Sequence, residues 1–179
     1  MDKEISSGGD APEIDGEHRP LQDDFLENLV GKWEITGNVL GQPLTQRGEG
    51  VWALNHQFLL LHFKASDEAP GATDPPYEAM VFIGFDNLSE RYVAHWLDTF
   101  GGRFSEALGY GRRKNGDREL ALMFEGGSGP LRNTLGWDAS ASTWKMVIEQ
   151  KNQKGHWYVF AEETFRRASS HEKTTAGLK

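Results

Sequence analysis

Ten short apolar runs separated by turn-forming residues constrain the fold of this chain more than any other feature. The runs cover 31–40, 45–54, 57–66, 77–86, 90–98, 103–111, 118–125, 130–138, 142–151 and 155–167. Links such as "DNLSE", "KNGD" and "NQKG" are short and of the hairpin kind. Parallel neighbours need crossovers of about a dozen residues or more. The sequence therefore predicts antiparallel strands that pair with their neighbours along the chain.

A meander of this length would leave two open edges unless the sheet closed on itself. An up-and-down barrel removes both edges, whereas the competing β-sandwich normally uses a long Greek-key return, and none appears here. We therefore expect an all-β fold, an antiparallel up-and-down β-barrel of about ten strands. Such a barrel is wider than the roughly eight-stranded barrels that side chains can fill, so we also expect a cavity.

The stretch "LQDDFLENLVG" has a different periodicity from the rest of the chain. Its apolar residues share one helical stripe and are Leu21, Phe25, Leu26, Leu29 and Val30. Acidic residues stand early in the stretch and Gly31 ends it, as at the two ends of a helix. The pattern predicts a short N-terminal helix that closes one end of the barrel.

Polar segments flank the apolar runs at both ends of the chain. We expect disordered tails at 1–20 and 168–179, which leaves one barrel domain at 21–167. Residues 1–28 hold 9 acids and 2 bases, so most of the net charge of −8 belongs to the N-terminal segment. The remainder is nearly neutral and has no basic footprint, so we expect no nucleic-acid partner.

Several kinds of site have no counterpart in the sequence. There is no cysteine, which excludes disulfides, thiolate zinc sites and cysteine nucleophiles. We find no metal-ligand spacing, phosphate loop, dinucleotide fingerprint or hydrolase elbow. No catalytic residue, metal site or cofactor is therefore predicted, and a binding module is favoured over an enzyme. The N-terminus lacks the apolar core of a secretory signal and no run of roughly 18 apolar residues occurs, so we expect a cytoplasmic protein without a membrane span.

A short helix, then Gly31-x-Trp33, then a meander ending in an arginine-bearing strand, resembles the calycin superfamily of lipocalins and fatty-acid-binding proteins. The resemblance implies that Trp33 packs at the closed end of the barrel beneath an arginine of "EETFRR". The spacing favours Arg167, with Arg166 as the alternative. Gly31, Trp33 and the arginine would then close the barrel structurally, through a cation–π contact.

The stretch "GFDNLSERYVAHWLD" strengthens this resemblance. It is similar to a Gly-aromatic-Asp, then Trp-x-Asp pattern of bacterial lipocalin-like domains, at Gly84, Phe85, Asp86, Trp96 and Asp98. The resemblance spans most of residues 25–167. It implies a fold and brings no activity with it.

Two pairs of residues are candidates for ligand contacts in or near the cavity. Trp96 and Asp98 share one face of their strand, where Asp98 would be a polar anchor at the cavity mouth or would initiate the turn "DTFGG". His62 and His95 stand within apolar strands and would be ligands or hydrogen-bonded wall residues. Alternation puts His95 on the face opposite Trp96.

A third pair could hold a carboxylate head group, as arginine and tyrosine do in fatty-acid carriers. This pair is Arg132 with Tyr158. The alternative is an outward Arg132 paired with Glu149. Trp144 completes the candidate ligand contacts, because it shares with Met146 and Ile148 a face that we expect to point inward.

The last strand is apolar on both faces, with Trp157 and Val159 on one and Tyr158 and Phe160 on the other. One of these faces must lie outside the barrel. A subunit interface would cover it, so a homodimer is predicted.

Together these observations predict that the barrel cavity binds a small hydrophobic or amphipathic, lipid-like ligand. Two alternatives stay open. One is a haem- or gas-binding barrel of the nitrobindin type, whose ligand histidine comes from near the C-terminal end, where this chain offers His156. The other is a small barrel enzyme that uses a cavity histidine or aspartate for acid–base chemistry.

Overall fold

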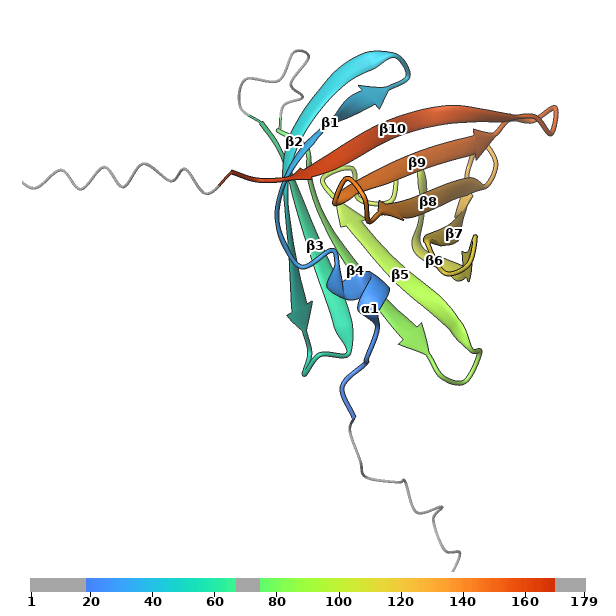
Figure 1. The fold of residues 1–179 in the computed structure, drawn as a ribbon. Helices are drawn as coiled ribbons and strands as arrows, with labels where there is room; N and C mark the ends of the chain where they lie inside the picture. The colour runs from blue at the N-terminus through green and yellow to red at the C-terminus, as the bar shows by residue number, and fades with distance from the viewer. Residues whose placement is uncertain (1–18, 67–74, 170–179) are drawn as a thin grey trace, which may run out of the picture.

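A computed structural model describes residues 19–66 and 75–169 of the chain. These residues form a closed antiparallel barrel in which each strand pairs with the next and β10 pairs back onto β1 (Figure 1). The expected tails lie largely outside the described residues. The elements are α1 (Asp24–Glu27), β1 (Gly31–Val39), β2 (Gln42–Ala53), β3 (Phe58–Ala65), β4 (Glu78–Asp86), β5 (Arg91–Asp98), β6 (Ser105–Lys114), β7 (Glu119–Gly126), β8 (Leu131–Asp138), β9 (Thr143–Lys151) and β10 (Trp157–Arg167).

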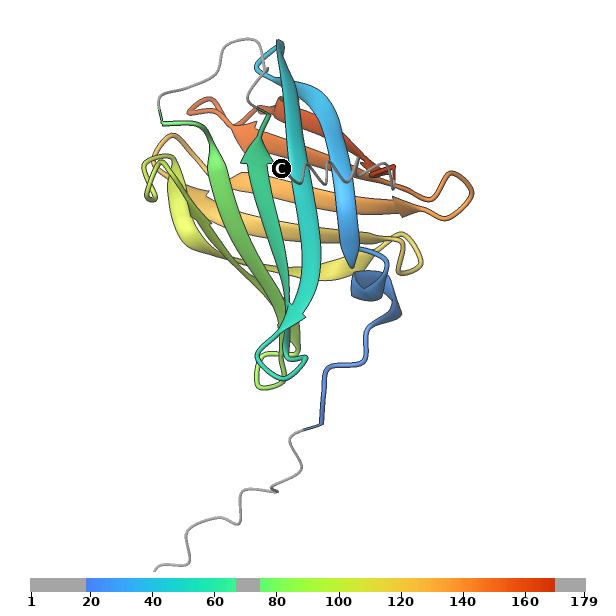
Figure 2. The same cartoon turned by 90° about the vertical axis from the view of Figure 1, so that its left-hand side faces the viewer.

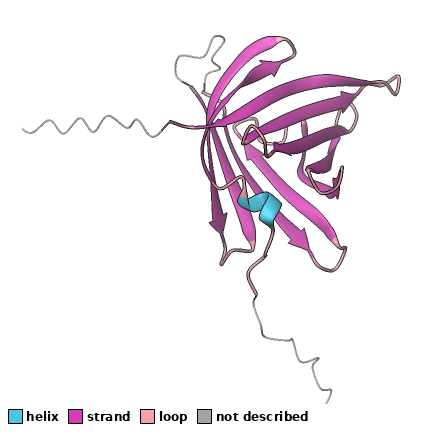
Figure 3. Cartoon of the chain, in the orientation of Figure 1, coloured by secondary structure: helices cyan, strands magenta, loops and turns pink. Residues whose placement is uncertain are grey.

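The predicted all-β barrel is confirmed, and most strand bounds agree within a few residues with those expected from the sequence. Figure 3 shows strands throughout, with one short helix at the N-terminal side. The agreement arises because side chains alternate between the two faces of each strand, a pattern that can be read from the sequence. In β3, for example, the side chains of Leu59, Leu61 and Phe63 are buried while Lys64 is exposed. Within the described residues no helix is long and apolar enough to cross a membrane.

The N-terminal helix is shorter than the predicted stripe. Asp23 caps it by accepting hydrogen bonds from the backbone N–H groups of Phe25 (3.0 Å) and Leu26 (2.9 Å). Leu21 is not part of the helix, because its backbone N–H donates to the carbonyl of His56 in the connection between β2 and β3. The apolar face is nevertheless buried, with Phe25 only 6% exposed and Leu26 fully covered.

Hydrogen bonds from several strands hold α1 across one end of the barrel. The indole N–H of Trp52 donates to the carboxylate of Glu27 (2.7 Å), and that of Trp144 donates to the carbonyl of Asn28 (3.2 Å). The hydroxyl of Tyr92 donates to Asp23, whose other oxygen lies 3.3 Å from the guanidinium of Arg113. The helix is thus tied to β2, β5, β6 and β9. It lies at one end of the barrel (Figure 2), and we call it the plug.

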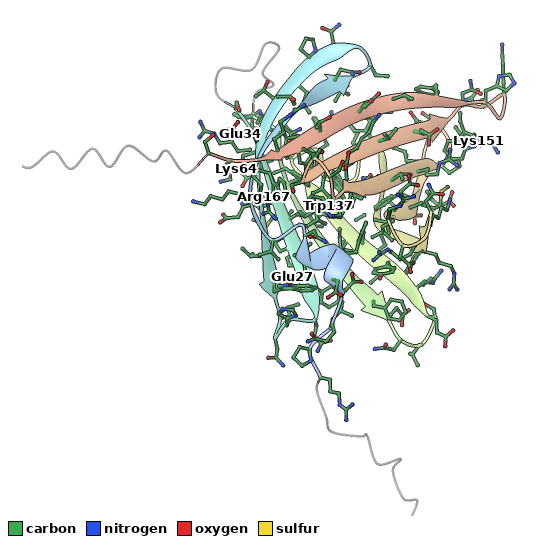
Figure 4. All side chains as sticks on the ribbon, viewed as in Figure 1. Glu27, Glu34, Lys64, Trp137, Lys151 and Arg167 are labelled. Atoms are coloured by element: carbon green, nitrogen blue, oxygen red, sulfur yellow. The ribbon has the colours of Figure 1, made fainter. Side chains whose placement is uncertain are left out.

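Trp33 and Arg167 complete this closed end. The guanidinium carbon of Arg167 lies 4.0 Å from the centre of the Trp33 ring, the contact that the sequence predicts. Arg167 also donates to the carbonyls of Val30 and, at 3.0 Å, Asn28. A Cβ at Gly31 would clash with this guanidinium, so the glycine leaves the space that Arg167 crosses. Figure 4 shows Arg167 close to α1, while Lys151 lies at the far end of β9.

The last strand contains an irregularity that the sequence analysis did not anticipate. Its register against β9 shifts between Val159 and Ala161, so Phe160 is an extra residue in a β-bulge. Before the bulge Tyr158 and Val159 are 40% and 50% exposed, and after it Ala161 is buried. The bulge therefore reverses which side of β10 faces the barrel interior, and this reversal explains why apolar residues occur on both faces of the strand.

We expect Trp33→Ala to lower the free energy of unfolding by about 3–5 kcal/mol, as other buried large-to-small substitutions do. Trp33 is 1% exposed and its indole N–H donates to the carbonyl of Leu29 at 2.8 Å. Urea denaturation measures the change. Leu88→Ala, at a side chain that is 99% exposed, is the control and should change little. An unaltered unfolding midpoint for Trp33→Ala would contradict the closing role of this residue.

Candidate functional site

A cavity of about 570 Å³ opens at the end of the barrel opposite α1. Its walls come from the ends of strands that lie away from the helix, including the end of β5 and the starts of β2, β8 and β10. Apolar side chains make up much of the lining, among them Leu44, Trp96, Phe100, Phe124, Ile148 and Phe160. The volume is in the range typical of small-molecule pockets, roughly 300–1,000 Å³.

Three polar side chains lie at the base of this cavity: Gln46, Asn133 and Glu163, which we call the polar floor. They are 4%, 3% and 5% exposed, respectively. On β8 and β10 the next inward residue toward α1 belongs to the tightly packed core, as Leu135 follows Asn133 and Phe165 follows Glu163. The polar floor therefore marks the boundary between the filled and the open half of the barrel.

Glu163 is the most unusual residue of the polar floor. Within the described residues its Oε2 atom is buried and has no hydrogen-bond partner. Its neighbours in register explain this, because Gly37 on β1 has no side chain and Met146 on β9 offers only a thioether. Burial raises the pKa of the Glu163 carboxyl to about 7. The group therefore titrates near neutral pH.

Asn133 also has unused hydrogen-bonding capacity. Its amide nitrogen lies 3.5 Å from the sulfur of Met146, a weak contact. Its Oδ1 atom is buried without a partner among the described residues. Burying a polar atom that makes no hydrogen bond costs about 1–3 kcal/mol. The polar floor therefore contains two buried oxygen atoms, and no hydrogen bond within the described residues compensates for their loss of contact with water.

Further polar groups lie nearer the mouth. Burial raises the pKa of Tyr77 far above its usual value, opposed by a hydrogen bond with Trp96 and reinforced by the charges of Asp98 and Glu163. Its hydroxyl therefore stays neutral at physiological pH. Arg103, in the connection before β6, is a basic residue of the lining and is exposed.

Of the residues singled out from the sequence, Trp96 and Asp98 line the cavity. Trp96 stacks on Phe63 with ring centres 6.0 Å apart. Asp98 also initiates the following turn, since its Oδ1 accepts hydrogen bonds from the N–H groups of Phe100 (2.9 Å) and Gly101 (3.2 Å). Asp98 is therefore both a polar residue of the cavity wall and the residue that initiates the turn.

Trp144 points inward, as expected, but it lies below the cavity and does not line it. It is fully buried and packs edge-on against Phe25 of α1, with ring centres 4.7 Å apart. The helix occupies the space that a ligand would need to reach this ring. Trp144 is therefore part of the closed end.

The two strand histidines lie outside the cavity, which corrects their assignment as ligand contacts. His62 alternates with the buried Leu61 and Phe63, and its Nε2 lies 2.5 Å from the carboxylate of Glu78 on the outer face. His95 is exposed and faces away from Trp96. Period-two alternation is the reason in both cases.

Arg132 and Tyr158 also fail to reach the cavity, so the predicted carboxylate-binding pair is wrong. Arg132 faces outward, 2.8 Å from Glu149, the alternative that the sequence left open. Its guanidinium lies over the ring of Trp157. Tyr158 precedes the bulge, is 40% exposed and donates a hydrogen bond to Gln150.

Sequence reasoning missed the polar floor, although one signal could have revealed Glu163. Once Arg167 is placed over Trp33 and Phe165 is taken as core, counting back in steps of two puts Glu163 on the inward face. Counting forward from Trp157 fails because the bulge inverts the facing. Gln46 and Asn133 carry no comparable signal, since short polar residues are common in strands that face solvent on one side.

No described residues form a cluster of three or more histidine, aspartate or glutamate side chains suited to a metal ion.

Residues 19–167 match the model of a family described as Protein of unknown function (DUF1579). The chain belongs to this family. The match covers the plug, all ten strands and the polar floor, so the cavity lies wholly within the family domain. A comparison with curated proteins finds no match.

The raised pKa of Glu163 predicts a pH-dependent stability. Between its unfolded pKa of 4.5 and its folded pKa of about 7, the folded state binds more protons than the unfolded state. The associated stability is present below about pH 4.5 and is lost as pH rises to about 7, by on the order of 3 kcal/mol. Glu163→Gln should therefore be more stable than the wild type at about pH 8 and similar to it at about pH 4.5.

Urea denaturation at the two pH values measures this difference. Glu162→Gln is the matched control, because Glu162 lies on the outer face of the same strand, 2.6 Å from Lys145. Equal stability of Glu163→Gln and the wild type at the higher pH would show that Glu163 is not held in a desolvated site.

Proposed function

We propose that this protein binds a small hydrophobic or amphipathic ligand in the barrel cavity. One observation carries the proposal: the three buried polar side chains of the described residues all lie in one largely apolar cavity. Stability alone would favour apolar side chains at these positions. A few polar groups within an apolar pocket are typical of small-molecule sites, where they orient the ligand.

The geometry of closure supports the same function. With α1 and the Trp33–Arg167 contact at one end, the cavity that the described residues form opens at the other end, through the mouth. We propose on this basis that the domain is a calycin-type barrel, for which the helix, Gly31-x-Trp33 and the terminal arginine are the matching features. The barrel of this chain and its family match are consistent with that assignment.

The haem alternative finds little support in the lining. No described residue that lines the cavity is a histidine, and His156 is exposed near the start of β10. A haem held in this cavity would have to take its axial ligand from another residue type. The prediction of a histidine-ligated haem therefore has no candidate ligand in the described cavity.

The enzyme alternative rests on one specific observation, the Glu163 carboxyl that titrates near neutral pH. Such a group is suited to act as a general base or acid. Asp98, the other acid of the lining, is engaged by the backbone of its turn. We therefore favour binding as the function and keep acid–base catalysis as the second candidate. Turnover that Glu163→Gln abolishes while ligand affinity persists would establish the second.

Filling the cavity tests the proposed function. Ala65, at the end of β3, and Ala161, which follows the bulge within β10, both line the cavity. We expect Ala65→Phe to weaken the binding of N-phenyl-1-naphthylamine, a neutral fluorescent probe, by at least about tenfold, and Ala161→Phe to do the same. The rise in probe fluorescence on titration measures the affinity, and energy transfer from tryptophan, with Trp96 in the cavity wall, supports it.

Leu97→Phe is the matched control, since Leu97 is 44% exposed on the outer face of β5. It adds a ring to the same strand as Trp96 without entering the cavity and should leave the affinity unchanged. A probe that binds the wild type and all three variants equally would place the binding elsewhere and contradict the proposal.

The homodimer and the cytoplasmic location stay predictions. Tyr158 and Val159 are exposed on β10, where an interface was expected, and Leu97 and Leu108 are exposed on β5 and β6. Light scattering at a mass twice the 20.1 kDa of the chain would support the dimer. If Val159→Lys converted such a dimer to a monomer, the interface would include β10.

A further inference from the structure

The polar floor restricts the chemistry of the ligand further than the proposed function does. Resting on that function, we propose that the ligand has an apolar body and a cationic amino head group, and that the head group lies at the polar floor against Glu163. A ligand with a carboxylate head could not pair with the ionised Glu163. The argument comes from the unused atoms, from the charges around them and from the depth at which they lie.

The unused atoms of the polar floor are a carboxyl and an amide oxygen, and both are acceptors when Glu163 is ionised. Oε2 of Glu163 and Oδ1 of Asn133 have no hydrogen-bond partner among the described residues. A carboxylate head offers no donor to either atom, whereas an ammonium group offers three. The floor thus has hydrogen-bonding capacity that matches an amine.

The charges that share the cavity with Glu163 point the same way. On the neighbouring strands Gly37 and Met146 carry no charge. Across the cavity lie Asp98, which is acidic, and Tyr77, which stays neutral. Arg103 is the basic residue of the described lining, and it belongs to the exposed connection before β6. Two acids against one rim arginine make the interior favourable for a cation and unfavourable for a second carboxylate.

The depth of Glu163 explains why the head group would enter first. Glu163 lies next to the packed core and Phe160 lies toward the mouth, so the wall along β10 runs from polar to apolar on the way out. An amphipathic amine would place its ammonium group at the floor and its chain along Trp96, Phe124 and Ile148. The pair formed with Glu163 would be shielded from solvent and from salt.

Proton linkage follows from this arrangement. Burial holds the pKa of Glu163 near 7 in the free protein, and an adjacent cation lowers the pKa of a carboxyl. Binding of the amine should therefore release about half a proton at about pH 7. Because only the ionised form pairs with the cation, the affinity should rise about tenfold between about pH 6 and about pH 8. An alkyl amine stays protonated throughout, as a lysine side chain does.

A matched series of probes tests the proposal: decylamine, 1-decanol and decanoate, each titrated calorimetrically into the full chain at the two pH values. We expect decylamine to bind at least about tenfold more tightly than decanoate at about pH 8, with affinity that rises with pH. Titrations in phosphate and in Tris, whose ionisation heats differ, measure the proton released. Decanol affinity should change little with pH.

Variants separate this proposal from the proposed function. Glu163→Gln should lose the preference for decylamine and its pH dependence while still binding decanol, whereas Glu162→Gln should behave as the wild type. Decanoate or decanol binding at least as tightly as decylamine, with no effect of Glu163→Gln, would overturn the head-group assignment and leave the proposed function standing. If none of the three probes bound and the cavity-filling variants matched the wild type, the proposed function itself would fail.

Discussion

The plug at the closed end is the interaction on which the rest of this structure depends. A ten-stranded barrel encloses more space than its own side chains fill, so a packed core within it needs a further element to fill one end. Phe25, Leu26 and Leu29 supply the cover, and hydrogen bonds from tryptophan, tyrosine and arginine side chains of the strands fix it. The half of the barrel next to the helix becomes solid, and the other half stays open.

The buried polar side chains of the described residues lie at the boundary between these two halves. Below it, Trp33, Trp144 and Phe165 are fully buried or nearly so and pack against one another or against the helix. Above it, the cavity reaches the mouth. Gln46, Asn133 and Glu163 lie at the boundary, where a side chain has packed neighbours on one side and open space on the other. A ligand that entered would complete the packing of the upper half.

The sequence predicted the architecture well because strand alternation and hairpin links are local signals. It also predicted the Trp33–Arg167 contact and the placement of Trp96 and Asp98 on the cavity face. It offered His62, His95 and Arg132 as ligand contacts although it had put His95 opposite Trp96 and had left an outward Arg132 paired with Glu149 open, because a shift of one residue changes the facing of a strand. Glu163 was overlooked for a related reason: the bulge at Phe160 inverts the facing of β10, and a bulge is set by pairing with β9 rather than by the residues themselves.

The contact of Arg167 with the carbonyl of Asn28 joins residues 139 positions apart. Every other strand pair of the barrel joins strands that follow one another along the chain, whereas β1 and β10 are its first and last strands. Long-range pairing of this kind carries the largest loop-closure cost and slows folding. The pairing that closes the barrel is therefore also the pairing that brings Arg167 to the closed end, and a nascent chain lacking β10 would have neither.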